Sequence, residues 1–384
     1  MKYKTNLIHK VSQEFRNKFH CDHESISLAP GRINIIGEHT DYNNGFAMPI
    51  AINRYVCVAI SKSNKDYSSV YSMNYKCLIH ITNSNRYVNN DPWNRLIHTL
   101  VNELQNKYTL VMKTNIVIVG DIPIGCGLSS STAFVIANVI AYLDLFSIEI
   151  NKIDLALLCH KIECKAFGSS CGLLDQYGII FSKKNKLLMI DFESNKMEYI
   201  PQNIKGCSWV LINSKIQREL SNSAYMERVR ECRKGLEILS KHCQITNYRD
   251  INKEALSILE EENNIIFKRL LHLISENERV LNMKKAILNS DKLSVGNILL
   301  HSHQSLKELY EVSCQEIDYI IDISKDFPNW FGGRIIGGGF GGCSIHLVFE
   351  DVVDEYKNYI IDYYNNKIGI MPEVLDIQFV DGVH

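Results

Sequence analysis

The segment GRINIIGEHTDYNNGF, residues 31–46, places an arginine, two acids and a histidine within ten positions and has a glycine near each end. A buried charge is costly unless a partner compensates it, so this composition in a tight turn needs an explanation. Glu38, His39 and Asp41 are therefore candidate ligand-binding residues. The alternative, from the residues alone, is a solvated acidic turn in which His39 has a structural role.

A second chemical pattern is formed by Gly125, Gly127 and three successive serines at 129–131, between an apolar strand and a helix. Unpaired backbone N–H groups and the positive end of a helix dipole can converge there on an anion. The serines occupy positions typical of helix N-caps. The segment lacks the lysine of a Walker loop, and Ser130 occupies the third-glycine position of a dinucleotide-binding turn, so neither of those sites is indicated.

The stretch GGGFGG, residues 337–342, is a third glycine-rich segment. It satisfies G-x-G-x-x-G, yet a strand is expected after it where a dinucleotide site needs a helix. Taken alone, it is equally well explained as a glycine-rich hairpin that permits tight packing.

The spacing of apolar residues predicts the elements that position these segments. We expect a strand followed by a helix within 114–145, a helix at 151–168, a hairpin across KKNK at 183–186, a strand near 207–214, helices over much of 221–325, and a strand, glycine turn and strand within 332–349. A chain of 384 residues exceeds the size at which a single core stops growing. We therefore expect two domains, residues 1–203 and 204–384.

Composition excludes several classes of protein. Lysine plus arginine total 42 against 43 for aspartate plus glutamate, so no strong field indicates nucleic acid or membrane as a partner. No stretch has the length of a transmembrane helix or the pattern of a signal peptide, which predicts a cytoplasmic protein. The 12 cysteines are scattered without a C-x-x-C pair and are expected to be mostly reduced core residues.

Three segments together resemble one family: GRINIIGEHTDYNNGF, GDIPIGCGLSSSTA and IGGGFGGC occur in the order and spacing of the three motifs of galactokinases, within the GHMP kinase superfamily. The resemblance runs from about residue 14 to residue 370 and includes SSCGLLDQ and NSAYMERVREC between the motifs. It implies an α+β fold of two domains, each a mixed or antiparallel sheet packed with helices, with the active site in the cleft between them.

The resemblance also implies an activity, which is transfer of the γ-phosphate of ATP to the anomeric hydroxyl of galactose. It assigns Asp175 as the catalytic aspartate, Arg32 as its partner, and Ser131 and Glu163 as Mg²⁺ ligands. Carboxylates in a turn can accept hydrogen bonds from sugar hydroxyls. The implied sugar contacts are Glu38, His39, Thr40, Asp41 and Tyr225, and the implied ATP contacts are Gly125, Cys126, Gly127, Leu128, Ser129, Ser130 and Ser131.

Two positions depart from the usual family pattern, and two rival functions stay open. Cys126 stands where alanine, glycine or serine is common, and Thr132 where alanine is usual; we expect modest effects on nucleotide affinity. A kinase for a related sugar such as N-acetylgalactosamine would share these motifs. A non-catalytic galactose and ATP sensor would be expected to lose part of the serine loop or the pair of Arg32 and Asp175, all of which are present. Family habit suggests a monomer.

Overall fold

The computed structural model describes residues 2–82, 91–109, 113–168, 172–202, 204–216, 221–243 and 245–383. From the N-terminus the elements are α1 (Lys2–Phe19), β1 (Ser25–Asn34), η1 (Asp41–Asn43), β2 (Phe46–Ala47), β3 (Pro49–Ser63), β4 (Ser68–Ser72), β5 (Cys77–Ile81), α2 (Pro92–Tyr108), β6 (Lys113–Gly120), α3 (Ser130–Leu145), α4 (Lys152–Phe167), α5 (Leu174–Phe181), β7 (Lys186–Asp191) and β8 (Lys196–Pro201). They are followed by β9 (Cys207–Asn213), α6 (Ser221–Cys243), η2 (Tyr248–Asp250), α7 (Lys253–Glu262), α8 (Asn264–Leu288), α9 (Lys292–Glu308), α10 (Gln315–Ser324), β10 (Trp330–Ile335), β11 (Cys343–Phe349), η3 (Glu350–Val352), α11 (Val353–Ile368) and β12 (Glu373–Asp376). Within the described residues, no helix has both the length and the apolar character that crossing a membrane requires.

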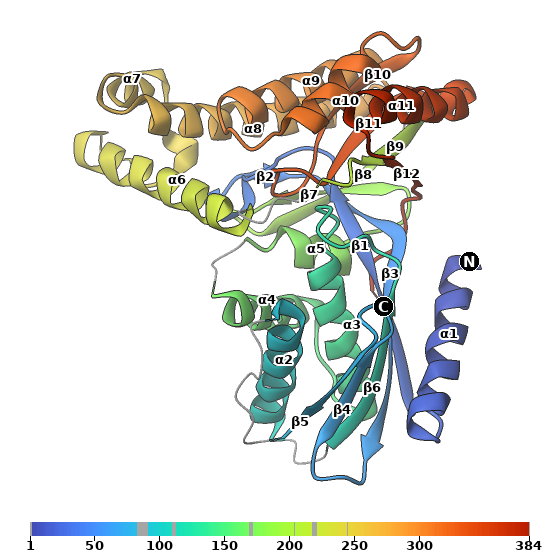
Figure 1. Ribbon diagram of the computed structural model, residues 1–384. Coiled ribbons are helices and arrows are strands. Elements are labelled where there is room, and N and C mark those ends of the chain that lie inside the picture. Colours follow the sequence, from blue (N-terminus) through green and yellow to red (C-terminus); the bar gives the residue numbers. More distant parts are fainter. Residues whose placement is uncertain are drawn as a thin grey trace.

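The largest sheet has five strands in the order β1-β3-β6-β4-β5 and is antiparallel except between β4 and β6. Successive side chains of a strand point to opposite faces. In β3, Cys57 packs in one cluster with Val11 of α1, whereas its neighbour Val58 belongs to the main core. That core includes Val135 of α3. Helix α1 therefore covers one face of the sheet and α3 the other, with α2 and α4 beyond α3 (Figure 1).

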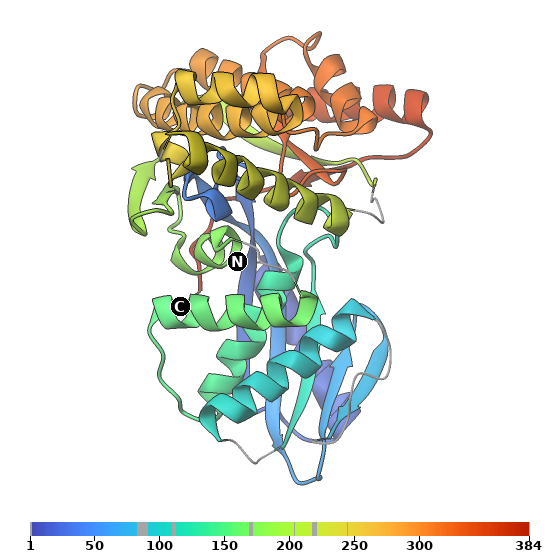
Figure 2. The same ribbon diagram turned by 90° about the vertical axis from the view of Figure 1, so that its left-hand side faces the viewer.

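The second half of the chain contains a four-stranded antiparallel sheet in the order β10-β11-β9-β12. One face of this sheet packs against helices in a separate core, in which Val210 of β9 clusters with Ile317 of α10 and Tyr356 of α11. Its other face, with Leu211 and Ile345, belongs to the main core. Figure 2 shows the helices of this half, coloured yellow to red, gathered above the first half. A third sheet joins β2, β7 and β8.

Most of the predicted elements are confirmed. They include the strand and helix within 114–145, the helix at 151–168, the strand near 207–214, the helical stretch of 221–325 and the hairpin around the third glycine segment. The α+β class with mixed and antiparallel sheets packed against helices is confirmed as well. The division of the chain into residues 1–203 and 204–384 stays a prediction, and residue 203 lies outside the described residues.

The hairpin expected across residues 183–186 is wrong. The apolar run before it forms α5, and the hairpin lies one element later, where β7 pairs with β8. Periodicity does not separate a short buried helix from a short buried strand, so tertiary contacts decide. Gly178 of α5 lies so close to β1 and β3 that a Cβ there would be 3.4 Å from the Cβ of Arg32 and 3.0 Å from that of Pro49.

The last described residues, 377–383, return to the first half of the molecule. Phe379 forms a bridge with Ile52 of β3, and the N–H of Val380 donates to the carbonyl of Ala51 at 3.0 Å. Farther on, the N–H of Gly382 donates to the carbonyl of Ser182 at 2.8 Å. The end of the chain is therefore part of the fold of the first half.

Two glycine segments from opposite halves touch through their backbones. A Cβ on Gly337 would lie 2.8 Å from the Cα of Gly127, and a Cβ on Gly127 would lie 3.0 Å from the carbonyl oxygen of Ile336. Both glycines have positive φ, +72° at Gly127 and +75° at Gly337. Any larger residue would separate the loop before α3 from the turn after β10.

We expect Gly337→Ala to lower the free energy of unfolding more than Gly369→Ala does. Both glycines have φ +75°, so each alanine carries a left-handed backbone cost of about 1–2 kcal/mol. Nothing lies within 4 Å of a Cβ at Gly369, whereas overpacking at Gly337 adds roughly 1–3 kcal/mol. Urea unfolding of both variants measures the difference, and equal losses would show that the two segments can separate freely.

Candidate active site

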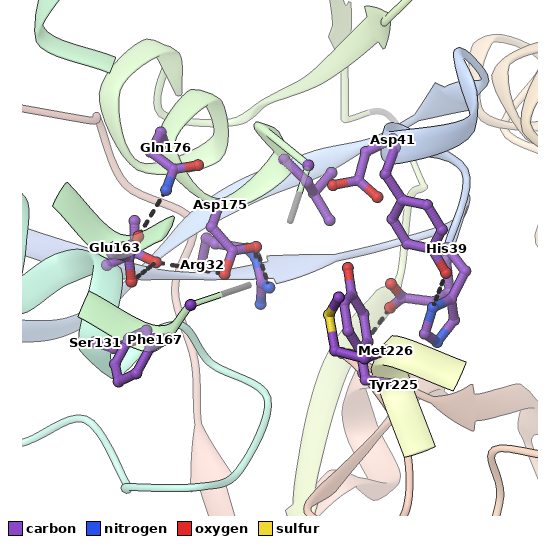
Figure 3. A pocket seen from close by; sticks show the side chains of 18 residues that line it. Arg32, His39, Asp41, Ser131, Glu163, Phe167, Asp175, Gln176, Tyr225 and Met226 are labelled. Atoms are coloured by element: carbon purple, nitrogen blue, oxygen red, sulfur yellow. Dashed lines mark hydrogen bonds and ion pairs between the residues drawn. The ribbon is translucent and has the colours of Figure 1, made fainter. Parts of the chain in front are cut away.

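A cleft of about 410 Å³ lies between the two halves of the molecule. It is lined by Arg32, Glu38, His39, Asp41, Tyr42, Ser131, Thr132, Glu163, Phe167, Gly168, Gly172, Leu174, Asp175, Gln176, Tyr225, Met226, Gly337 and Gly338. Figure 3 shows Arg32, Glu163 and Asp175 on one side of the cleft and His39, Asp41 and Tyr225 on the other. The predicted catalytic and metal residues and all predicted sugar contacts except Thr40 are therefore brought together.

Arg32 and Asp175 form an ion pair at the centre of one wall. The Nε atom of Arg32 donates to Oδ1 of Asp175 at 2.9 Å, and a second guanidinium nitrogen bonds the same oxygen. The remaining nitrogen, Nη1, donates to the carbonyl of Gly127 at 2.6 Å. Arg32 is buried, whereas 31% of the Asp175 side chain stays exposed to the cleft. The pair therefore ties β1, the glycine loop and the start of α5 together and leaves the carboxylate accessible.

The serines before α3 differ in position and partner. Ser129 is the N-cap residue of α3, which confirms the predicted position, but it has φ +57° and its side chain makes no capping hydrogen bond. Its hydroxyl instead donates to Oδ2 of Asp175 at 2.5 Å. Ser131 lines the cleft, and Ser130 and Ser131 border an apolar pocket beside it. The serine run therefore lies between two cavities, with its first member bonded to the central carboxylate.

The other predicted ATP contacts lie behind the serines and shape the loop. Gly125 and Gly127 both have φ +72°, a conformation that favours glycine. Cys126 and Leu128 are buried, and the carbonyl of Leu128 accepts from the N–H of Arg32 at 3.2 Å. None of these four residues lines the cleft.

Glu163 of α4 is a buried carboxylate without an ion-pair partner among the described residues. Its oxygens accept hydrogen bonds from Thr132 Oγ1 at 3.1 Å and Gln176 Nε2 at 2.6 Å, and Ser131 also bonds to it. Burial, and then the charge of Asp175, raises the pKa of Glu163 to about 7. A cation beside it would relieve this cost, and hard oxygen donors suit Mg²⁺.

The turn at residues 37–46 holds four of the five predicted sugar contacts, and two of these four, Glu38 and Thr40, bond to other groups of the protein. Glu38 is buried and accepts from Arg334 Nη2 at 3.1 Å and the N–H of Gly337 at 2.9 Å. Thr40 does not line the cleft, because its hydroxyl lies 2.7 Å from the carbonyl of Phe46 inside the turn. Arg334, which the sequence analysis did not identify, is fully buried and compensates the charge of Glu38.

His39 and Asp41 also line the cleft. Burial, and then the charge of His272, lowers the pKa of His39 to about 3, so the ring is neutral, and its Nδ1 lies 2.9 Å from the hydroxyl of Tyr42. Burial, and then the charge of Asp175, raises the pKa of Asp41 to about 6. A Cβ on Gly172 would lie 1.8 Å from Asp41 Oδ2, so glycine is required where the chain approaches this carboxylate.

Tyr225 enters the cleft from α6, in the second half of the chain. Its ring centroid lies 5.5 Å from that of His39 and 5.6 Å from that of Tyr42. This contact places the tyrosine against the same turn that carries the candidate sugar-binding residues.

The sequence analysis missed an apolar pocket of about 200 Å³ beside the glycine loop. Tyr75, Trp93 and Phe134 line it together with Ser130 and Ser131. These aromatic residues come from the turn between β4 and β5, from α2 and from α3, so no local pattern connects them. The sequence offered only an indirect signal for this pocket. A loop that binds the phosphates of a nucleotide implies an apolar site nearby for the base.

Comparisons with known proteins agree along the whole chain. Residues 13–62 match the galactokinase galactose-binding signature, residues 95–183 the N-terminal domain of GHMP kinases and residues 283–366 the C-terminal part of GHMP kinases. A galactokinase of Thermosipho africanus is 35% identical over 355 residues, which cover 92% of this chain and 98% of that protein. A galactokinase of Halalkalibacterium halodurans is 31% identical and covers 100% of this chain and 98% of its own length.

Solved structures extend the comparison to three dimensions. The crystal structure of Lactococcus lactis galactokinase complexed with galactose superposes with a TM-score of 0.91 at 27% identity, over 98% of this chain and 99% of that one. The Methanococcus jannaschii mevalonate kinase has a TM-score of 0.68 at 19% identity, over 94% and 99% of the chains, and is similar in fold alone. With a relative 35% identical over nearly its full length, the chain belongs to the galactokinase family of GHMP kinases.

Proposed function

We propose that this protein transfers the γ-phosphate of ATP to the anomeric hydroxyl of galactose, giving galactose 1-phosphate and ADP. The observation that carries the proposal is the position of Asp175, which lies in one cleft with Asp41, His39 and Tyr225 and bonds to Ser129 of the glycine loop. A sugar bound against the turn would therefore present a hydroxyl to Asp175 on the side from which a phosphate on the loop can be reached. The galactose-binding signature over residues 13–62 supports the choice of sugar.

Asp175 acts in this proposal as the acceptor of the hydroxyl proton, while the sugar oxygen attacks the γ-phosphorus and ADP leaves. Arg32 holds the carboxylate in one orientation through its bonds to Oδ1, and its positive charge offsets negative charge near the transferring group. Phosphoryl transfer depends mainly on positioning and charge stabilisation, which suits a site built from fixed ion pairs.

Ser131 and Glu163 would hold Mg²⁺. No group of three or more His, Cys, Asp or Glu side chains that could hold a metal by itself is found among the described residues, so the ion would take its other ligands from ATP phosphates and water. When bound, the ion neutralises phosphate charge. Glu163 is already held in place by Gln176 and Thr132.

ATP would bind with its phosphates at the start of α3, where the first backbone N–H groups of the helix have no intrahelical acceptors. Its base would enter the apolar pocket lined by Tyr75, Trp93 and Phe134, which adjoins the same serines. An aromatic lining suits a planar purine. We also propose that the protein is a monomer, as its resemblance to galactokinases implies.

Replacing Asp175 by asparagine is expected to lower kcat by at least about two orders of magnitude, the scale of a positioned acid–base group. Asparagine keeps the size of the side chain but cannot take up the proton. Galactose and ATP dissociation constants, measured by calorimetry, should change little. Near wild-type turnover in this variant would mean that Asp175 has only a structural role.

Glu163→Gln is expected to raise the Mg²⁺ concentration needed for half-maximal rate and to lower the maximal rate, with galactose binding unchanged. Because the pKa of Glu163 is raised to about 7, its ionised fraction grows as pH rises through 7. The apparent Mg²⁺ affinity of the wild type should therefore increase over this range, and the variant should lose that increase. Identical magnesium titrations for the two proteins would contradict the assignment.

We expect strong discrimination between galactose and its 4-epimer glucose. A site built to hydrogen-bond a hydroxyl can reject an analogue that leaves its groups unpaired by about 10⁴ or more. Asp41→Ala should therefore weaken galactose binding substantially, measured by calorimetry, and a coupled ADP-release assay compares the sugars. Comparable rates with glucose would refute the role of the polar turn. A faster rate with N-acetylgalactosamine would instead indicate a kinase for that sugar.

A further inference from the structure

Helix α8 holds the turn at residues 37–46 from the opposite half of the molecule. Glu276 of this helix is fully buried, and its Oε1 accepts from the backbone N–H groups of Gly37 at 3.0 Å and Glu38 at 3.3 Å. Its other oxygen accepts from Arg279 Nε at 2.6 Å. A carboxylate therefore binds the first two N–H groups of the turn.

Two further residues of α8 bond to the same turn. Asn277 Oδ1 accepts from the N–H of Phe46 at 2.8 Å, and His272 Nε2 lies 3.2 Å from the carbonyl oxygen of Glu38. A Cβ on Gly45 would lie 2.5 Å from Asn277 Oδ1, so this contact also requires glycine. Helix α8 thus bonds to both ends of the turn.

The contact of Glu276 is charge-assisted. Burial alone would raise the pKa of Glu276, but the charges of Arg279, His272 and Arg334 lower it to about 2, so the group is ionised at neutral pH. Hydrogen bonds to an ionised acceptor are roughly twice as strong as neutral ones. Ser302 of α9 donates a further bond to Oε1 at 2.9 Å, which fixes the carboxylate in place.

The turn needs external support because its own conformation is unfavourable. His39 has φ +63° and Asn44 has φ +56°, left-handed values that few non-glycine residues adopt, although asparagine and histidine adopt them more often than most. The bonds from α8 flank this strained stretch on both sides. None of His272, Glu276 and Asn277 lines the cleft, so they do not meet the ligand directly.

We propose that Glu276 and Asn277 are positioning residues that hold the turn in its sugar-binding conformation and thereby set the affinity for the sugar. The inference rests on the proposed function, because it takes galactose as the ligand of this turn. It differs from a purely structural role in one measurable respect. Loss of these bonds should weaken sugar binding selectively, since the loop before α3 has no bond to α8 among the described contacts.

The experiment compares four variants by calorimetric binding of galactose and of ATP, with kcat and both KM values. Glu276→Gln keeps the shape but removes the charge, Asn277→Leu removes the acceptor for Phe46, and Asn277→Asp restores an acceptor. Glu278→Gln is the matched control, because Glu278 is an exposed carboxylate on the same helix.

We expect Glu276→Gln to raise the Kd and KM for galactose about tenfold, as expected when charge-assisted bonds become neutral. Asn277→Leu should raise them about threefold, the effect of one lost hydrogen bond. Asn277→Asp and Glu278→Gln should stay near wild type, and ATP binding should be unchanged in all four.

Several outcomes would overturn the inference. Equal losses of galactose and ATP affinity, or a lower melting temperature with unchanged galactose affinity, would show that α8 only stabilises the fold. If Glu276→Gln is not recovered folded, the comparison of Asn277→Leu with Asn277→Asp decides alone. The positioning role alone is refuted if the wild type binds and phosphorylates galactose but Asn277→Leu and Asn277→Asp have the same galactose affinity. If the wild type does not bind galactose, both the proposed function and the positioning role are refuted.

Discussion

The free-energy cost of burying carboxylates is the constraint on which the rest of the cleft depends. Three carboxylates in and around it have a guanidinium partner, in the pairs Asp175 with Arg32, Glu38 with Arg334, and Glu276 with Arg279. Asp41 and Glu163 have none among the described residues, and burial raises their pKa values to about 6 and about 7. A buried carboxylate without a cationic side chain beside it is stabilised most by a ligand that donates hydrogen bonds or carries positive charge. In the proposed function, these two unpaired groups are the ones that would meet a sugar hydroxyl and a metal ion.

The same pairs join parts of the chain that are far apart in sequence. Arg334 of β10 donates to the backbone carbonyls of Asn34 and Ile35 as well as to Glu38, so the second half of the molecule holds the end of β1 directly. The turn itself contains little regular structure: the three-residue helix η1 and the first residue of β2. Its geometry is consequently a property of how the two halves pack and cannot be assigned to either half alone.

Local chemistry explains why part of this site could be predicted from the sequence. The glycines and polar residues at 31–46 and 125–131 marked two candidate binding segments, and the roles of Asp175, Arg32, Glu163 and Ser131 came from the family resemblance. Arg334 and Glu276 could not be found this way, because their roles come from contacts with residues more than 230 positions away. The hairpin predicted at 183–186 failed for a related reason, since contact with β1 and β3 selects a helix for an apolar run that local periodicity leaves ambiguous.

The return of residues 377–383 to the first half has a consequence for biosynthesis. Ala51, Ile52 and Ser182 are synthesised long before the segment that bonds to them. Domains usually fold as units in the order in which they emerge. Here the first half can collapse early, but it completes its hydrogen bonding only after the second half has been made. These contacts close a loop through most of the chain, and they can form only after both halves have been synthesised.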